Sequence, residues 1–155
     1  MLANVMTAAT AVGPTVLVTE KDSRCARALA AEHGVKVVDD PGGGQGAAVE
    51  VGIAAAPDWP VLVVNADLPD ARARDLLALL GTMPENGIAI AAAPDGTTNA
   101  LALARPGLFA PLYGPGSAAR FRAHAEELGA EAAELEAPAL ARDVDTAAQL
   151  AQLVR

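Results

Sequence analysis

"VLVVNADLPD", residues 61–70, joins four apolar residues to a loop that carries Asn65, Asp67 and Asp70. A short apolar run that ends in polar residues is typical of a buried strand, and we expect this strand to cover residues 60–66. Carboxylates that follow a strand can hold a metal ion, or they can cap the next helix. Both interpretations stay open on this stretch alone.

Strands and helices alternate on either side of this stretch. Alternation of this kind predicts an α/β fold with three layers, in which helices cover both faces of a mostly parallel sheet. With 155 residues, the chain is expected to form a single domain over residues 1–155. We predict strands at 15–19, 35–39, 60–66, 87–94 and 98–105, with an edge strand at 130–136, and helices at about 2–11, 22–33, 46–56, 70–81, 117–129 and 143–154, with a short helical piece at 106–114.

The composition limits the kinds of partner and the cellular location that we expect for the protein. Hydrophobic residues make up 52% of the chain and aromatic residues only 3%, so the core must consist of Ala, Val and Leu. The net charge of −8, without a basic cluster, argues against nucleic acid or an anionic membrane surface as partner. The sequence has neither a membrane span nor the basic start of a signal peptide, which indicates the cytoplasm. The single cysteine, Cys25, is expected to pack in the core. A homo-oligomer is compatible with the sequence.

A glycine-rich loop, "DPGGGQG" at 40–46, follows the second predicted strand. Ligands of open parallel sheets bind beyond the carboxyl ends of the strands, where this loop is expected to lie. The backbone amides of Gly43, Gly44, Gln45 and Gly46 could cradle a phosphate or approach a base, or the loop could be a plain connector. Neither the P-loop ending nor the spacing of a dinucleotide-binding fingerprint is present.

Asp67 is the candidate metal ligand of the opening stretch. Mg²⁺ prefers one or two carboxylates together with substrate phosphates and water, and one aspartate at a strand end meets that need. Asp70 is more simply the cap of the following helix. Asn65 is expected to satisfy backbone groups of the loop.

Two further loops indicate an anion site. Thr98 and Asn99 lie where a strand begins, and Gly114, Gly116 and Ser117 lead into a helix whose amino end favours an anion. Ser117 could cap that helix, contact a phosphate, or do both. Near the end of the chain, Asp143 and Asp145 precede a helix, where they could cap it or reach the same metal as Asp67. Two aspartates on a metal that faces an anion site are typical of nucleotidyl transfer.

Five motifs occur in order: "DPGGGQGAA", "VNADLPDARARDL", "TTNALAL", "YGPGSAARF" and "RDVDTAAQL". Together, from about residue 15 to 153, the sequence resembles the 2-phospho-L-lactate or phosphoenolpyruvate guanylyltransferases. These enzymes are part of the GT-A-like nucleotidyltransferase group, whose fold is that of the nucleotide-diphospho-sugar transferases, and they act in the biosynthesis of the deazaflavin coenzyme F-420. The resemblance implies that GTP is joined to a phosphorylated three-carbon acid, with release of pyrophosphate and with Mg²⁺ as cofactor.

The resemblance also assigns residues by matching motif. Asp67 corresponds to a catalytic metal aspartate, and Asp143 or Asp145 to a second metal ligand. Thr98, Gly114 and Ser117 correspond to contacts with the phosphorylated acid, with Asn99 and Gly116 beside them. The loop from 42 to 46 corresponds to the nucleotide side.

One departure from the family pattern leaves alternatives. Family members begin with a further strand, a basic loop that holds the triphosphate, and a helix. No counterpart of the strand and the basic loop is found here, and Met1 falls where that helix should already be under way. We therefore expect the chain to lack the central strand and the basic nucleotide loop. It could be an incomplete guanylyltransferase, a non-catalytic remnant that binds a small anion or serves in assembly, or a related nucleotidyltransferase with another acceptor, such as a sugar phosphate or molybdopterin.

Overall fold

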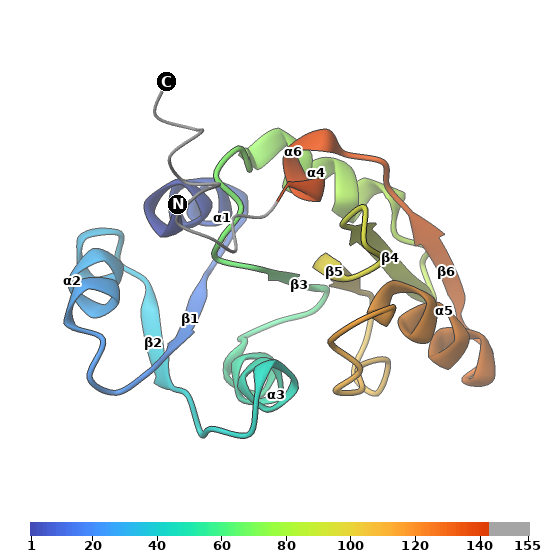
Figure 1. Ribbon diagram of the computed structural model, residues 1–155, viewed down its shortest axis with the longest axis horizontal. Coiled ribbons are helices and arrows are strands. Elements are labelled where there is room, and N and C mark those ends of the chain that lie inside the picture. Colours follow the sequence, from blue (N-terminus) through green and yellow to red (C-terminus); the bar gives the residue numbers. More distant parts are fainter. Residues whose placement is uncertain (143–155) are drawn as a thin grey trace.

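The computed structural model describes residues 1–142, so the predicted helix at 143–154, with Asp143 and Asp145, lies outside the described residues. Helices and strands alternate as predicted over most of this range (Figure 1). The elements are α1 (Leu2–Val12), β1 (Val16–Thr19), α2 (Arg24–Glu32), β2 (Lys36–Asp39), α3 (Gln45–Ala55), β3 (Val61–Val64), α4 (Ala73–Thr82), β4 (Gly87–Ala92), β5 (Thr98–Leu103), α5 (Ser117–Glu127), β6 (Glu131–Glu134) and α6 (Pro138–Ala141).

The strands form two separate sheets. β1 and β2 pair in parallel, and the other four strands lie in the order β3-β5-β4-β6. β4 and β6 are parallel, whereas β5 runs antiparallel to both β3 and β4, so the sheet is mixed where we expected it to be mostly parallel. The reason is the short turn between β4 and β5, in which the Ala93 N–H bonds to the Thr97 carbonyl at 2.9 Å. A turn of this length closes an antiparallel pair, since a parallel pair needs a long crossover.

Helices cover both faces of the four-stranded sheet. Figure 1 shows α4 and α6 on one side and α5 on the other. Side chains of a strand alternate between faces, and here small and large residues alternate with them. Toward α5, the strands present Ile88, Ile90, Leu101 and Leu103 around Phe121; toward α4, they present Ala89, Ala91, Ala100 and Ala102 against Leu76 and Leu79. The alanines leave room for α4 to lie close to the sheet.

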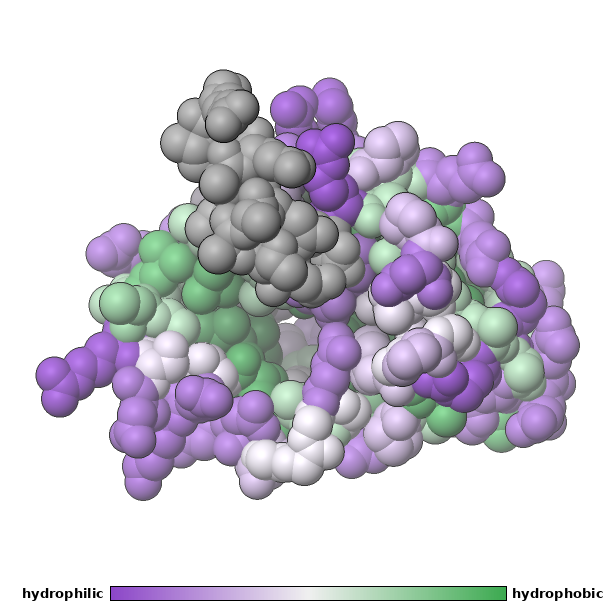
Figure 2. Space-filling view, viewed as in Figure 1, coloured by the Kyte–Doolittle hydropathy of each residue, from purple (hydrophilic) through white to green (hydrophobic). Residues whose placement is uncertain are grey.

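A groove separates the two sheets. β1 and β3 are not paired with each other, and a groove of about 490 Å³ lies between them, lined by apolar residues of both strands and of α3. Figure 2 shows apolar residues beside a hollow near the middle of the molecule.

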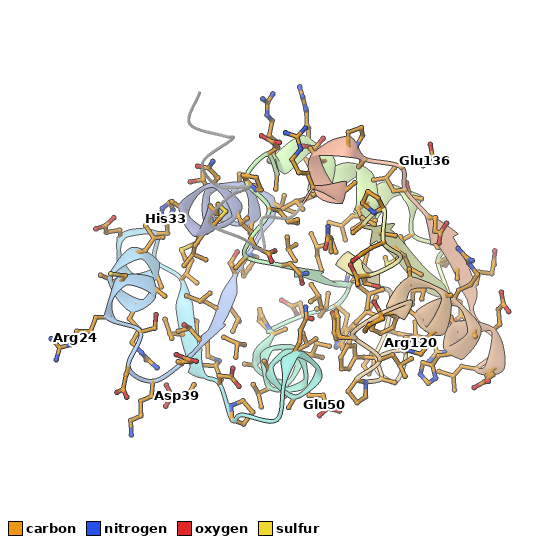
Figure 3. All side chains as sticks on the ribbon, in the orientation of Figure 1. Arg24, His33, Asp39, Glu50, Arg120 and Glu136 are labelled. Atoms are coloured by element: carbon orange, nitrogen blue, oxygen red, sulfur yellow. The ribbon has the colours of Figure 1, made fainter. Side chains whose placement is uncertain are left out.

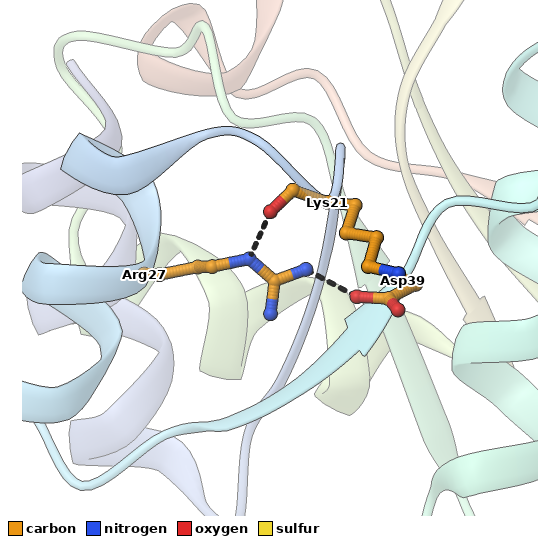
Figure 4. A network of polar contacts seen from close by, with 3 residues as sticks. All are labelled: Lys21, Arg27 and Asp39. Atoms are coloured by element: carbon orange, nitrogen blue, oxygen red, sulfur yellow. Dashed lines mark hydrogen bonds and ion pairs between the residues drawn. The ribbon is translucent and has the colours of Figure 1, made fainter.

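Of the basic residues before β2, Arg27 holds elements of the fold together. The Arg27 Nε–H donates to the Lys21 carbonyl at 3.0 Å, and the same guanidinium forms an ion pair with Asp39 at the end of β2 (Figure 4). Arg24 points away from the body of the protein (Figure 3). These contacts fix α2 against the small sheet.

Two local predictions are wrong. Cys25 is exposed, because α2 packs through Ala26 and Ala30, which are four residues apart on another face of the helix. Residues 106–114 contain no helix. Pro106 and Pro111 remove backbone donors in this segment, and it runs as an irregular loop past the buried Leu108. No helix within residues 1–142 is both long enough and apolar enough to cross a membrane.

The pairing of β4 with β6 predicts the outcome of a glycine substitution. A Cβ atom at Gly87 would lie 2.2 Å from the Glu131 carbonyl oxygen, a contact that only a shift of backbone can relieve. We expect Gly87→Ala to lower the free energy of unfolding by about 1–3 kcal/mol in urea titrations.

The matched control is Gly81→Ala in α4, where a Cβ atom would meet nothing within 4 Å. There the substitution should be neutral or should stabilise the protein by about 0.5–1 kcal/mol, because alanine favours the helix. Equal stabilities of the two variants would contradict the close approach of β4 and β6.

Candidate active site

A cavity of about 550 Å³ lies at the end of β3. Several predicted site residues from distant parts of the sequence meet in it, together with residues that the sequence did not single out for a site. The predicted ones are Gln45, Asp67, Thr98, Asn99, Gly114 and Ser117; the additional lining residues include Asn65, Asp95, Thr97 and Tyr113. The structure therefore joins the loop after β3, the β4–β5 turn and the amino end of α5 in one site.

Two buried hydroxyl groups form one end of this cavity. The Thr98 and Ser117 side chains are 2% and 0% exposed, and their oxygen atoms are 2.9 Å apart, within hydrogen-bond distance. Thr98 is the first residue of β5 and Ser117 the first of α5. The prediction that Ser117 caps α5 is wrong, because the cap position belongs to Gly116, whose φ of 69° is left-handed. Ser117 thereby directs its hydroxyl at Thr98.

Two of the first backbone N–H groups of α5 already donate hydrogen bonds within the protein. The Ser117 N–H donates to the Gly114 carbonyl at 3.0 Å, and the Ala118 N–H donates to the Gly96 carbonyl at 3.1 Å. These two donors are thus committed to the protein itself. An anion at this end would therefore be bound by the hydroxyl pair and by backbone N–H groups other than these two.

Asn65 connects three segments around the cavity. Its backbone N–H donates to the Asn99 carbonyl at 2.9 Å, and its side-chain amide donates to the Thr98 carbonyl at 3.3 Å. Asn65 was expected to satisfy backbone groups of its own loop; its side chain instead satisfies a backbone carbonyl of β5. The Gln45 amide in turn donates to the Asn65 oxygen at 2.8 Å, which ties the start of α3 to the end of β3.

Asn99 is anchored to α6. Its side-chain N–H donates to the carbonyl of Leu140 in α6 at 2.9 Å, and the residue is 1% exposed. The amide therefore ties β5 to α6 just before the end of the described chain. Its oxygen lies 3.5 Å from the Asn65 side-chain nitrogen.

The glycine-rich loop divides into two parts. Gly43 and Gly44 are exposed with positive φ and do not line the cavity, whereas Gln45 does. Gly46 is buried, and a Cβ atom there would lie 2.4 Å from the Cβ atom of Pro111. Gly46 therefore permits the close approach of α3 to the loop before α5. Of the predicted nucleotide-binding set, only Gln45 reaches the cavity.

The charges around the cavity are acidic. Asp67 and Asp95 both line it, and no Lys, Arg or His among residues 1–142 does so. The Thr97 hydroxyl, and then the Thr97 backbone N–H, lower the pKa of Asp95 below its usual value, which keeps this carboxylate ionised. A polyphosphate could approach these carboxylates only with a cation.

Asp67 fits a Mg²⁺ site of the kind completed by substrate phosphates and water. It follows β3 in a turn and is half-buried at the cavity. Residues 1–142 contain no cluster of three metal-ligating side chains. Asp67 and Asp95 are the carboxylates that line the cavity within this range. One carboxylate is sufficient where phosphates and water supply the other oxygens. The predicted ligands Asp143 and Asp145 lie outside the described residues.

Asp70 does not cap α4. The helix begins at Ala73, and the Asp75 carboxylate accepts the Arg72 N–H at 3.2 Å. Asp70 lies in a turn before it and forms an ion pair with Arg142 at 3.5 Å. The cap prediction for Asp70 is wrong because two additional residues intervene before the helix.

Comparisons with known proteins agree with this architecture. A solved structure described as a nucleotide-diphospho-sugar transferase from Desulfovibrio desulfuricans has a TM-score of 0.74 at 15% identity, over 99% of this chain and 73% of that one. This similarity confirms the predicted fold. Residues 1–137 match the MobA-like NTP transferase domain, which defines the class as nucleotidyltransferase-like.

The chain belongs to the phosphoenolpyruvate and 2-phospho-L-lactate guanylyltransferase family of this class. It is 40% identical to the phosphoenolpyruvate guanylyltransferase of Streptomyces scabiei, over 90% of this chain and 67% of that protein. It is 34% identical to the 2-phospho-L-lactate guanylyltransferase of Natrialba magadii, over 99% of this chain and 70% of that protein. A phosphoenolpyruvate guanylyltransferase of Sphaerobacter thermophilus is 44% identical over 60% of this chain, but only 45% of that relative is covered.

Tyr113 packs against Phe121 with ring centroids 5.2 Å apart and also lines the cavity. Burial raises the pKa of its phenol well above the usual value. Burial favours the neutral form of the phenol. The buried Tyr113 ring therefore contributes fully to the stability of the fold below about pH 10, and this contribution is lost as the pH rises beyond that value.

Tyr113 is the one tyrosine of the sequence, so tyrosinate absorbance reports on it alone. We expect little tyrosinate at about pH 10 in the folded protein, and ionisation near pH 10 in concentrated urea. Identical titration midpoints in the two states would show that the ring is not buried.

Proposed function

We propose that the protein is a GTP-dependent guanylyltransferase. It would join GTP to a phosphorylated three-carbon acid (2-phospho-L-lactate, phosphoenolpyruvate or 3-phosphoglycerate) and release pyrophosphate, in coenzyme F-420 biosynthesis in the cytoplasm. The observation that carries the proposal is the single cavity that places the Asp67 carboxylate together with the buried Thr98–Ser117 hydroxyl pair. The names of the relatives, which include a 3-phospho-D-glycerate guanylyltransferase of Phenylobacterium zucineum, support the reaction class.

The reaction requires no protein nucleophile. A phosphate oxygen of the acid attacks the α-phosphorus of GTP and forms a new P–O bond. The bond from the α-phosphorus to the oxygen bridging to the β-phosphate breaks, and pyrophosphate leaves with that electron pair. Catalysis of such a transfer consists mainly of positioning and charge stabilisation. The cavity meets this need, because donors for an anion and a carboxylate for a cation both line it.

The Thr98 and Ser117 hydroxyls are the groups that would hold the phosphate of the acid. Both are buried on rigid elements, so little side-chain freedom is lost when they bind. Asn65 and Asn99 hold the backbone at Thr98 in place through the bonds described above. The acid is thereby oriented from the β5 side.

Asp67 is the residue that would bind Mg²⁺. When bound there, the ion would offset the charge of the phosphates and align them. The two carboxylates and the absence of a basic side chain among the described lining residues support this assignment.

The activity test uses the chain with GTP, Mg²⁺ and each of the three acids in turn. Release of pyrophosphate, together with a guanylylated acid detected by mass spectrometry, is the expected result with at least one acid. A sugar phosphate and molybdopterin serve as the competing acceptors. Turnover with one of these alone would favour the related nucleotidyltransferase, and binding of an acid without turnover would favour the non-catalytic remnant.

We expect Asp67→Asn to lower turnover by about 100-fold or more, because the neutral amide binds Mg²⁺ poorly. The matched control is Asp70→Asn, three residues along the same loop, where the ion pair with Arg142 is exposed and worth little. Mn²⁺ binding by electron paramagnetic resonance should weaken in the first variant and not in the second. An unchanged rate and unchanged Mn²⁺ affinity in Asp67→Asn would overturn the metal assignment.

Ser117→Ala should mainly weaken binding of the acid. Loss of one hydrogen bond to a charged group predicts a rise in KM for the acid of about 10- to 100-fold, with kcat and the KM for GTP changed little. Ser23→Ala is the control, since the Ser23 side chain forms no hydrogen bond at the start of α2. Steady-state kinetics with the acid varied decide the outcome; a rise confined to the KM for GTP would place Ser117 on the wrong side of the cavity.

A further inference from the structure

The loop that leads into α5 is fixed by a single arginine. The Arg120 guanidinium donates to the Leu112 carbonyl through Nε at 3.2 Å and through Nη2 at 2.8 Å. It also donates to the Tyr113 carbonyl at 3.1 Å and to the Pro115 carbonyl. Figure 3 shows Arg120 at the beginning of α5, beside this loop. One side chain therefore binds three of the four carbonyls from residue 112 to 115.

These bonds determine where the amides of the loop point. In a trans peptide the N–H points opposite to the carbonyl of the preceding residue. Carbonyls that face Arg120 therefore direct the N–H groups of Tyr113, Gly114 and Gly116 away from it. Within residues 1–142, no acceptor is bonded to any of these three N–H groups, and Tyr113 and Gly114 line the cavity.

The glycines of the loop permit this arrangement. Gly114 and Gly116 have φ values of 106° and 69°, a region that other residues rarely adopt. A Cβ atom at either position would lie 3.7–3.8 Å from the guanidinium nitrogens, in contact with them. Successive amides that point to one side form a concavity that favours an anion. The N–H groups of this loop could thus bind an anion in place of the Ser117 and Ala118 N–H groups, which already donate to the protein.

We propose that Arg120 is a positioning residue for the anion-binding end of the cavity. Arg120 lies outside the cavity lining and acts through the backbone of the loop, so its guanidinium does not touch the substrate. Its planar fork reaches several carbonyls at once, which the single ammonium group of lysine cannot reproduce. That the anion is the phosphorylated acid rests on the proposed function; the action of Arg120 on the loop does not.

The first test measures the loop itself, by ¹⁵N relaxation and with inorganic phosphate as probe. We expect order parameters of Gly114 and Gly116 near about 0.85 in the wild-type protein, and below about 0.6 in Arg120→Ala and Arg120→Lys. The dissociation constant of phosphate, from amide shifts of Gly114, should rise about tenfold in both variants, as for the loss of one net hydrogen bond. Arg122→Ala is the control, because Arg122 lies on the same helix but pairs with Glu134.

Each other outcome contradicts the proposal. If Arg120→Lys retains phosphate affinity, charge rather than the fork matters. If affinity falls while the loop stays ordered, Arg120 binds the anion directly. If nothing changes, or Arg122→Ala has the same effect, the loop does not depend on Arg120.

The second test separates this proposal from the proposed function. With the acid that supports turnover, the Arg120 variants should raise its KM about tenfold and leave kcat nearly unchanged. If the wild-type protein shows no turnover with any acid, the proposed guanylyltransferase function is contradicted. The relaxation experiment would still decide the role of Arg120. A fall in kcat alone would remove Arg120 from substrate positioning.

Discussion

The pairing of β5 with both β3 and β4 is the constraint on which the site depends. All six residues of β5 are buried, and its backbone is bonded on both edges. Its first two residues, Thr98 and Asn99, therefore have fixed positions at the cavity. The same strand receives the Asn65 N–H, which fixes the loop of Asp67, and it sends the Asn99 amide to α6. Displacing β5 would displace Thr98 and the loop of Asp67 together.

Periodicity in the sequence was sufficient to predict most elements, because the signal is local. The alternation in "GIAIAA" and "NALAL" is visible without any structure, and it places one set of side chains on each face of the sheet. Strand direction is different, since it depends on how many residues lie between strands. The turn-forming stretch "PDGT" at 94–97, where the two predicted strands meet, carried that information, and the order of strands and helices alone did not.

In the candidate site, too, some features could be predicted from the sequence and others could not. Asp67, Thr98 and Ser117 were predicted from loop positions and family motifs, and the structure brings them to one cavity. The exact start of a helix was not predictable, so the cap roles of Asp70 and Ser117 were assigned wrongly. Arg120 carries no local signal, because its partners are backbone carbonyls, which are the same in every sequence. Only its position three residues after Ser117, within one helical turn, could have drawn attention to it.

The split between β1 and β3 has a consequence for cooperativity. The small sheet with α2 and α3 meets the rest of the protein through helix contacts, and near the cavity through the bond between Gln45 and Asn65. Such a unit can open with a free energy below that of global unfolding. A ligand that contacts Gln45 on one unit and Ser117 on the other would close the two together, so part of its binding energy would be spent on aligning them. The affinity of the site is therefore coupled to the rigidity of a boundary that lies outside it.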